Sequence, residues 1–235
     1  MLLGILALLA TTHPATAAIP ADVGTPEAGT SKMETAIIGA LVLISIISIA
    51  LIIERGLALR RNKVIPPELI AAQRHYLSPE DLPGLRALCD RYPSAHGRLL
   101  ACAIDHRHLP RQEITEALQT RARHEINRME RGLVVLEITT GIAPLMGLVG
   151  TIFGLIVLFK GMSGAGGDDT ALFATGISIA LRATLMGLVI AIPSLTAWSG
   201  YNRKVEALAV ELENLSDEFL RTQHAAQKQY AEYPA

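Results

Sequence analysis

Two threonines and one arginine are the residues of this chain best able to do chemistry in an apolar setting: Thr151, Thr184 and Arg182. They lie in two long stretches that hold no other charged residue. A hydroxyl both donates and accepts hydrogen bonds, so it can hold a chain of water without placing a permanent charge in lipid. The alternative is that each hydroxyl bonds to a carbonyl of its own helix. A guanidinium stays charged and cannot relay protons by titration.

Arg182 lies about eleven residues into its apolar stretch, roughly 16 Å deep at 1.5 Å per residue. On a helix it shares a face with Thr175 and Ser178, away from Thr184. A cation at that depth needs an acidic partner or water. We expect it to meet a carboxylate on the helix of a partner protein or to line a hydrated pore. The alternative is that it extends into a wide aqueous vestibule.

The cysteines and clustered histidines do not indicate a metal site or a cofactor. Cys89 and Cys102 match no zinc spacing, and we interpret both as reduced, buried apolar residues. His106 and His108 are two apart, which points them to different sides of a helix, so a solvated loop is the preferred interpretation. No apolar stretch carries a Ser/His pair, an HExxH motif or paired aspartates, so we do not expect an enzyme.

The composition indicates a membrane protein. Half of the 235 residues are hydrophobic, 18% are charged, and the mean hydropathy is +0.35. The net charge of −1 argues against a general nucleic-acid binder, because phosphate recognition needs a concentrated basic surface.

Three stretches are long and apolar enough to cross a bilayer, which makes this an all-α membrane protein with three transmembrane helices. We expect these helices at residues 36–53, 133–160 and 171–200. Between and after them we expect a cytoplasmic helical domain at 54–132, a periplasmic loop at 161–170, and a cytoplasmic C-terminal helix and tail at 201–235.

Basic residues set the expected orientation. They follow the first span, precede the second and follow the third, as Arg55, Arg61, Arg128, Arg131 and Arg203 illustrate. The positive-inside rule then predicts a periplasmic N-terminus and a cytoplasmic C-terminus.

The first 18 residues form a candidate signal peptide, followed by a periplasmic segment at 19–35. Ala15-Thr16-Ala17 suits signal peptidase, but no Lys or Arg precedes the apolar core. An uncleaved periplasmic extension and a misplaced start are the alternatives.

Two amphipathic helices flank the spans. The stripe from Ile114 to Leu133 predicts one long helix that continues through Gly132 into the second span. After the third span, Val205, Leu208, Leu212, Leu215 and Phe219 form a short heptad seam. We expect these helices to pack on each other or across subunits.

Small residues recur in the second and third spans. Lipid gives helices no hydrophobic reason to associate, so small residues that let backbones approach become the packing face. We expect this close contact between the second and third spans of adjoining copies, although generic packing is the simpler interpretation. Prolines inside both spans predict kinks that serve gating or packing. The packing residues are Gly147, Gly150, Gly154, Ala180, Gly187 and Ala191; the prolines are Pro144 and Pro193.

The two spans together resemble the MotA/TolQ/ExbB proton-channel family, and ExbB- and TolQ-type members most. The family's APxxGLxGTxxG pattern is filled by Ala143 to Gly154, and its GIxxALxxTxxGLxxAIP pattern by Gly176 to Pro193. The resemblance implies a pentamer of this subunit around one or two helices of a single-span ExbD- or TolR-like partner with a membrane aspartate. Through that partner it implies work on a TonB- or TolA-like protein.

The same resemblance implies that Thr151 and Thr184 line the pore, with Arg182, Ser178 and Thr175 on a second polar face. The expected function is that of an inner-membrane proton-channel or stator subunit in Ton- or Tol-type energy transduction.

One position departs from the resemblance. ExbB- and TolQ-like members typically carry a glutamate where this chain has Ile179. Loss of that carboxylate makes a non-conducting scaffold paralogue the alternative. If Arg182 pairs tightly with the partner's aspartate, that acid becomes a poorer proton carrier.

Overall fold

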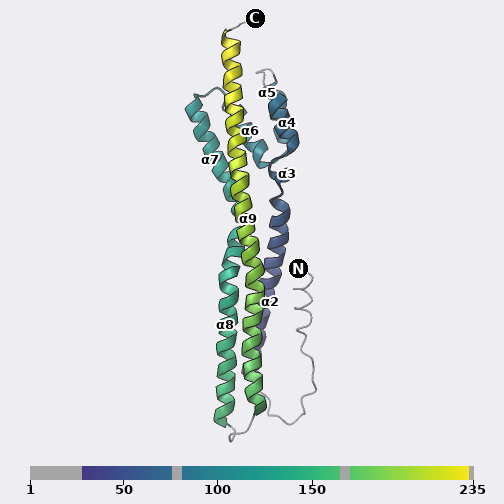
Figure 1. Cartoon of the computed structure of the whole chain (residues 1–235), viewed down its shortest axis with the longest axis vertical. Coiled ribbons are helices and arrows are strands. Elements are labelled where there is room, and N and C mark those ends of the chain that lie inside the picture. Colours follow the sequence, from purple (N-terminus) through teal and green to yellow (C-terminus); the bar gives the residue numbers. More distant parts are fainter. Residues whose placement is uncertain (1–27, 76–80, 165–169, 233–235) are drawn as a thin grey trace. The chain divides into compact units, whose positions relative to one another are not determined.

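The computed structural model describes residues 28–75, 81–164 and 170–232, and all regular structure in these ranges is helical. The candidate signal peptide and most of the expected segment at 19–35 lie outside the described residues, and so do Asp168 and Asp169, the two acids of the expected periplasmic loop. The helices are α2 (Ala28–Ala58), α3 (Arg61–Val64), α4 (Pro67–His75), α5 (Leu82–Arg91), α6 (Ala95–Asp105), α7 (Arg111–Glu130), α8 (Leu133–Gly164) and α9 (Thr170–Glu232) (Figure 1).

Three of these helices are long and apolar enough to cross a membrane. The candidate spans are Lys32–Ala58 in α2, Leu133–Phe159 in α8 and Gly176–Ala225 in α9. An all-helical chain with three such spans agrees with the expected fold class. The expected third span and C-terminal helix are parts of a single 63-residue helix, α9.

The chain divides into two compact units. The membrane unit contains the described residues up to 49 and those from 137 to 196, and the helical domain contains residues 50–136 and those from 197 onward. Each unit has a hydrophobic core of its own.

The membrane unit is built from parts of α2, α8 and α9. Its small core holds Leu41 and Ala143, both fully buried, with Ile37, Ile190 and Ala191. Large apolar side chains on the outer faces of α8 and α9 are exposed, including Leu145, Leu148, Leu181, Leu185 and Ile192. Such surfaces suit contact with lipid or with further membrane helices.

The helical domain buries the two amphipathic stripes in one core. Ile114, Leu118 and Met129 of α7 share this core with the seam from Val205 to Phe219 in α9. The two helices therefore contribute to one core within a single chain.

The expected continuous helix through Gly132 is wrong. Helix α7 ends at Glu130, the Arg131 amide donates to the Asn127 carbonyl over 3.2 Å, and α8 starts at Leu133. Glycine weakens a helix interior. The Arg55 side chain also packs tightly against Gly132, where a Cβ would lie 2.2 Å from Arg55 Nε. The helix is therefore interrupted at Gly132, the glycine between the apolar stripe and the second span.

Candidate functional site of the membrane unit

Helices α8 and α9 approach closely along a row of glycines, and they lie side by side in Figure 1. A Cβ on Gly187 would lie 2.6 Å from the Ala143 carbonyl oxygen, and one on Gly147 would lie 3.0 Å from the Ala183 carbonyl oxygen. At Gly154 a Cβ would lie 2.8 Å from the Gly176 carbonyl oxygen. These neighbours are backbone atoms, so any side chain here would push the helices apart.

The remaining small residues of the expected packing face lie along the same contact. A Cβ on Gly150 would lie 2.2 Å from the Ala183 Cβ and 3.6 Å from the Ile37 side chain of α2. Ala180 and Ala191 of α9 are buried. The structure makes this contact within one chain, whereas we expected it across adjoining copies.

Thr151 and Thr184 meet across this contact. Their hydroxyl oxygens are 2.5 Å apart, and both residues are partly buried. Thr151 Oγ1 also donates to the Gly147 carbonyl over 3.0 Å, and Thr184 Oγ1 lies 3.3 Å from the Ala180 carbonyl. Because each hydroxyl has one proton, Thr184 donates to Thr151 while Thr151 donates to its own helix, and the longer approach to the Ala180 carbonyl is the weaker contact. The pair forms a short polar bridge between two apolar helices.

A second hydroxyl pair joins α2 to α9. Ser48 and Ser194 are buried, their hydroxyl oxygens are 2.5 Å apart, and Ser194 Oγ also donates to the Ile190 carbonyl over 2.8 Å. The sequence offered only a weak signal for this pair, namely two serines in otherwise apolar spans.

Arg182 is exposed at the surface of the membrane unit and lines a small cavity of about 40 Å³. Ile179, at the departure from the family pattern, lines the same cavity, and so does Glu34 of α2. Our sequence interpretation missed Glu34, because that residue precedes the expected start of the first span. Ser178 is half-buried, and Thr175 is part of α9.

The two prolines lie inside helices that continue past them. Pro144 lies within α8 and Pro193 within α9. Each ring removes an amide donor from its helix, which leaves the carbonyl four residues earlier without its usual partner. A role in gating or packing stays a prediction.

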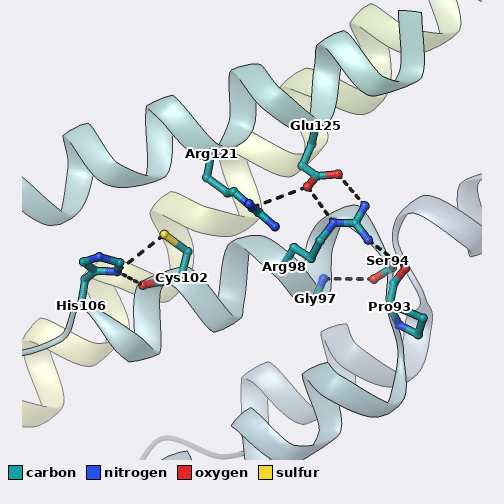
Figure 2. A network of polar contacts seen from close by, with 8 residues as sticks. All are labelled: Pro93, Ser94, Gly97, Arg98, Cys102, His106, Arg121 and Glu125. Atoms are coloured by element: carbon teal, nitrogen blue, oxygen red, sulfur yellow. Dashed lines mark hydrogen bonds and ion pairs between the residues drawn. The ribbon is translucent and has the colours of Figure 1, made fainter. Parts of the chain in front are cut away.

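The helical domain carries a buried ion pair between α6 and α7 (Figure 2). Glu125 is 4% exposed, and its two carboxylate oxygens accept from Arg98 Nε over 2.7 Å and from Arg98 Nη2 over 2.5 Å. Arg121 Nε lies 3.6 Å from the same carboxylate. Planar, two-point pairing of this kind fixes the angle between the helices as well as supplying charge.

One cysteine and one histidine are neighbours in the described part of the chain: Cys102 Sγ lies 3.7 Å from His106 Nδ1 (Figure 2). No group of three or more His, Cys, Asp or Glu residues able to hold a metal is found there. Cys89 is buried and Cys102 is partly buried, and both are free thiols. Nδ1 of His106 lies 2.8 Å from the Cys102 carbonyl oxygen. Burial raises the pKa of the Cys89 thiol to about 11, which suits a packing residue better than a nucleophile.

Three apolar helices, two of them joined by hydroxyl and glycine contacts, define a multi-pass helical membrane protein. The sequence pattern described as the MotA/TolQ/ExbB proton channel family matches residues 92–214, and the chain belongs to this family. The matched segment contains both threonines of the bridge.

Relatives of ExbB and TolQ type are among the similar proteins. The biopolymer transport protein ExbB of Helicobacter pylori is 38% identical over 81 residues, which are 34% of this chain and 56% of that protein. An ExbB-like biopolymer transport protein of Synechocystis is 34% identical over 161 residues, 65% of this chain and 61% of that protein. The Tol-Pal system protein TolQ of Haemophilus influenzae is 32% identical over 108 residues, 46% of this chain and 47% of that protein.

These matches confirm the resemblance to ExbB- and TolQ-type members. The chain spans between 47% and 61% of the length of these three relatives.

Proposed function

We propose that this chain is an inner-membrane proton-channel or stator subunit in Ton- or Tol-type energy transduction. Ion flow through its oligomer would drive movement of a partner that reaches across the periplasm. Membership of a proton-channel family and the names of the ExbB and TolQ relatives support this function. The observation that carries it is the bridge between Thr151 and Thr184, in which two hydroxyls meet at 2.5 Å inside an apolar helix pair.

The proposed assembly is a pentamer of this chain around a single-span ExbD- or TolR-like protein whose membrane aspartate carries protons. A TonB- or TolA-like protein would receive the work. The exposed apolar faces of α8 and α9 supply surfaces for such contacts, since isolated helices would otherwise meet only lipid. We propose a periplasmic N-terminus and a cytoplasmic C-terminus, supported by the basic residues that flank the spans.

In this proposal the threonine bridge supplies a hydroxyl path for protons, and the glycine row holds α8 and α9 close enough to form it. A hydroxyl that donates to one group and accepts from another can pass a proton along hydrogen bonds without becoming charged. Arg182, Ser178 and Thr175 would form a second polar face on α9. Arg182 would not carry protons, because a guanidinium stays charged.

A non-conducting scaffold is the second candidate, and Ile179 favours it. An isoleucine lies where ExbB- and TolQ-like members typically carry a glutamate, and the neighbouring Arg182 adds a positive charge that repels cations. Such a paralogue would keep the helix packing and the partner and transport nothing.

Proton uptake by vesicles that contain this chain and its single-span partner tests the proposed function. Thr151→Val and Thr184→Val keep the side-chain shape and remove one hydroxyl each. We expect each to lower uptake about tenfold or more, because the loss of one hydroxyl interrupts the proposed path and about 1.4 kcal/mol of added barrier is tenfold in rate.

The matched control is Thr196→Val. Thr196 is exposed on α9, and its hydroxyl donates to the Ile192 carbonyl over 2.9 Å. Its loss should leave uptake unchanged. Unchanged uptake in the Thr151→Val and Thr184→Val double variant contradicts the hydroxyl path, and a wild-type complex that binds its partner but takes up no protons supports the scaffold.

A further inference from the structure

A cavity in the membrane unit is lined by two residues of opposite charge. It has a volume of about 40 Å³ and is lined from α2, α8 and α9. Glu34 of α2 and Arg182 of α9 are the charged residues among those that line it; Gly150 and Phe153 contribute from α8 and Ile179 from α9. Apart from these two side chains the lining is apolar or glycine, so neither charge has another ionic group within the cavity.

The helix register explains why the two residues line the same cavity. Ser48 bonds to Ser194, and Ile37 and Ala183, each eleven residues earlier on its helix, both lie against Gly150. Helices α2 and α9 therefore run in the same direction. Glu34 lies 14 residues before Ser48, and Arg182 lies 12 residues before Ser194. The two residues are therefore offset along the helix axes by two residues, or about 3 Å at 1.5 Å per residue. Both side chains are long enough to cover that distance.

The cavity has room for water between the charges. A volume of about 10 to 15 Å³ is enough for one molecule, and this cavity exceeds it. Glu34 is half-buried, and Arg182 is exposed at the outer surface. A water that accepts from the guanidinium and donates to the carboxylate would join them at little cost relative to a direct bond.

We propose that Glu34 is the counter-ion of Arg182, and that this pair across the cavity ties α2 to α9. An arginine within a membrane span is costly unless it finds an acid or water, and Glu34 is the acid that the fold supplies beside it. The pair leaves the local charge near zero.

This inference deepens the proposed function and rests on it for one consequence. When Glu34 balances the charge of Arg182 within the chain, Arg182 does not require an ion pair with the aspartate of the single-span partner. That aspartate stays free to bind and release protons, which a tight pair with Arg182 would hinder.

The other charged group near this end of α2 is Lys32, which is exposed and two residues from Glu34. It does not line the cavity. Helix α8 contributes no charged side chain to the lining, and Asp168 and Asp169 lie outside the described residues. Lys32 therefore serves as a matched control for a nearby charge outside the cavity.

The test is a double-mutant cycle on the full-length chain in lipid nanodiscs, followed by thermal unfolding. We expect Glu34→Gln and Arg182→Gln each to lower the unfolding temperature by about 3 °C or more. The double variant should fall no further than the worse single variant, because contacting residues are not additive. Lys32→Gln should leave the unfolding temperature unchanged.

Infrared spectroscopy at neutral pH provides a second readout that needs no ion flow. Without Arg182, the carboxylate of Glu34 has no cation among the residues that line the cavity. Arg182→Gln should therefore shift the carboxylate stretching bands of Glu34, which the Glu34→Gln, Arg182→Gln double variant identifies by their absence. The exchange of both charges, Glu34→Arg with Arg182→Glu, should recover the wild-type unfolding temperature.

Additive effects of the two single variants, together with unshifted carboxylate bands in Arg182→Gln, would overturn the counter-ion pair. Additivity with a dependence of the unfolding temperature on anionic lipid would instead assign Arg182 to a lipid phosphate. Neither result depends on proton uptake. A chain can therefore fail this test and still conduct, or pass it and prove to be a scaffold.

Discussion

At the scale of single residues, burial decides which groups stay neutral. His96 of α6 is fully buried, and neither ring nitrogen has a hydrogen-bond partner within the described residues. Desolvation lowers the pKa of His96 from 6.5 to about 4, while the charge of Glu211 acts weakly in the opposite direction. The histidine is therefore neutral in the folded chain at neutral pH. The sequence around His96 did not predict that it is buried.

This burial predicts a pH dependence of stability. The unfolded chain binds a proton at His96 below pH 6.5 and the folded chain only below about 4, so the contribution to stability is complete above 6.5 and is lost as the pH falls through that window. The loss should reach about 3 kcal/mol. Chemical denaturation of the full chain between pH 7 and 4 should detect it, and His96→Leu should flatten the profile.

The control for that profile is His124→Leu. His124 is exposed on α7, so its removal should leave the profile as in wild type. A His96→Leu variant that keeps the full wild-type slope would mean that other groups, and not this imidazole, cause the loss of stability.

At the scale of helices, the glycine row decides how closely α8 and α9 pack. Five glycines of these helices lie where an added Cβ would come within 3.0 Å of the opposite helix, and the neighbours at Gly187, Gly147 and Gly154 are backbone atoms. Backbone cannot turn away as a side chain can. The spacing of these glycines is apparent in the sequence. Only the structure reveals that those of α8 face α9, and those of α9 face α8, within the same chain.

We therefore expect Gly187→Ala to weaken the α8–α9 contact. Its Cβ would lie 2.6 Å from the Ala143 carbonyl oxygen, and overpacking of this kind costs about 1 to 3 kcal/mol. Thermal unfolding of the detergent-solubilised chain should report a lower midpoint. The matched change is Gly141→Ala on α8, where a Cβ meets nothing within 4 Å and the midpoint should not fall. Equal effects of the two substitutions would contradict a specific role of the close contact.

At the scale of the whole molecule, the chain has two units with separate cores. The membrane unit depends on small residues and hydroxyl pairs, because lipid removes the hydrophobic drive for helix association. The helical domain depends on a conventional apolar core and on the ion pair of Arg98 with the buried Glu125. We infer that the two units respond to different substitutions.

Arg98→Met tests this separation. It leaves the buried Glu125 carboxylate with Arg121 as its remaining cation, at 3.6 Å. Removing one partner of a buried pair costs about 3 to 5 kcal/mol, and we expect the lower end because Arg121 remains. Hydrogen exchange should increase in residues 95–130, while amides of the membrane unit keep their wild-type protection. Increased exchange throughout both units would mean that they unfold together.

The sequence by itself determined the three apolar spans, the family motifs and the glycine spacing, because these depend on local composition and on the 3.6-residue period of a helix. It could not determine the register between helices, which is fixed by side chains far apart in the chain that pack together. Only the tertiary structure brought Glu34 beside Arg182, paired Ser48 with Ser194, buried His96 and interrupted the helix at Gly132. The pore role of Thr151 and Thr184 stays a prediction, since it depends on contacts with other chains as well as on the bridge within this one.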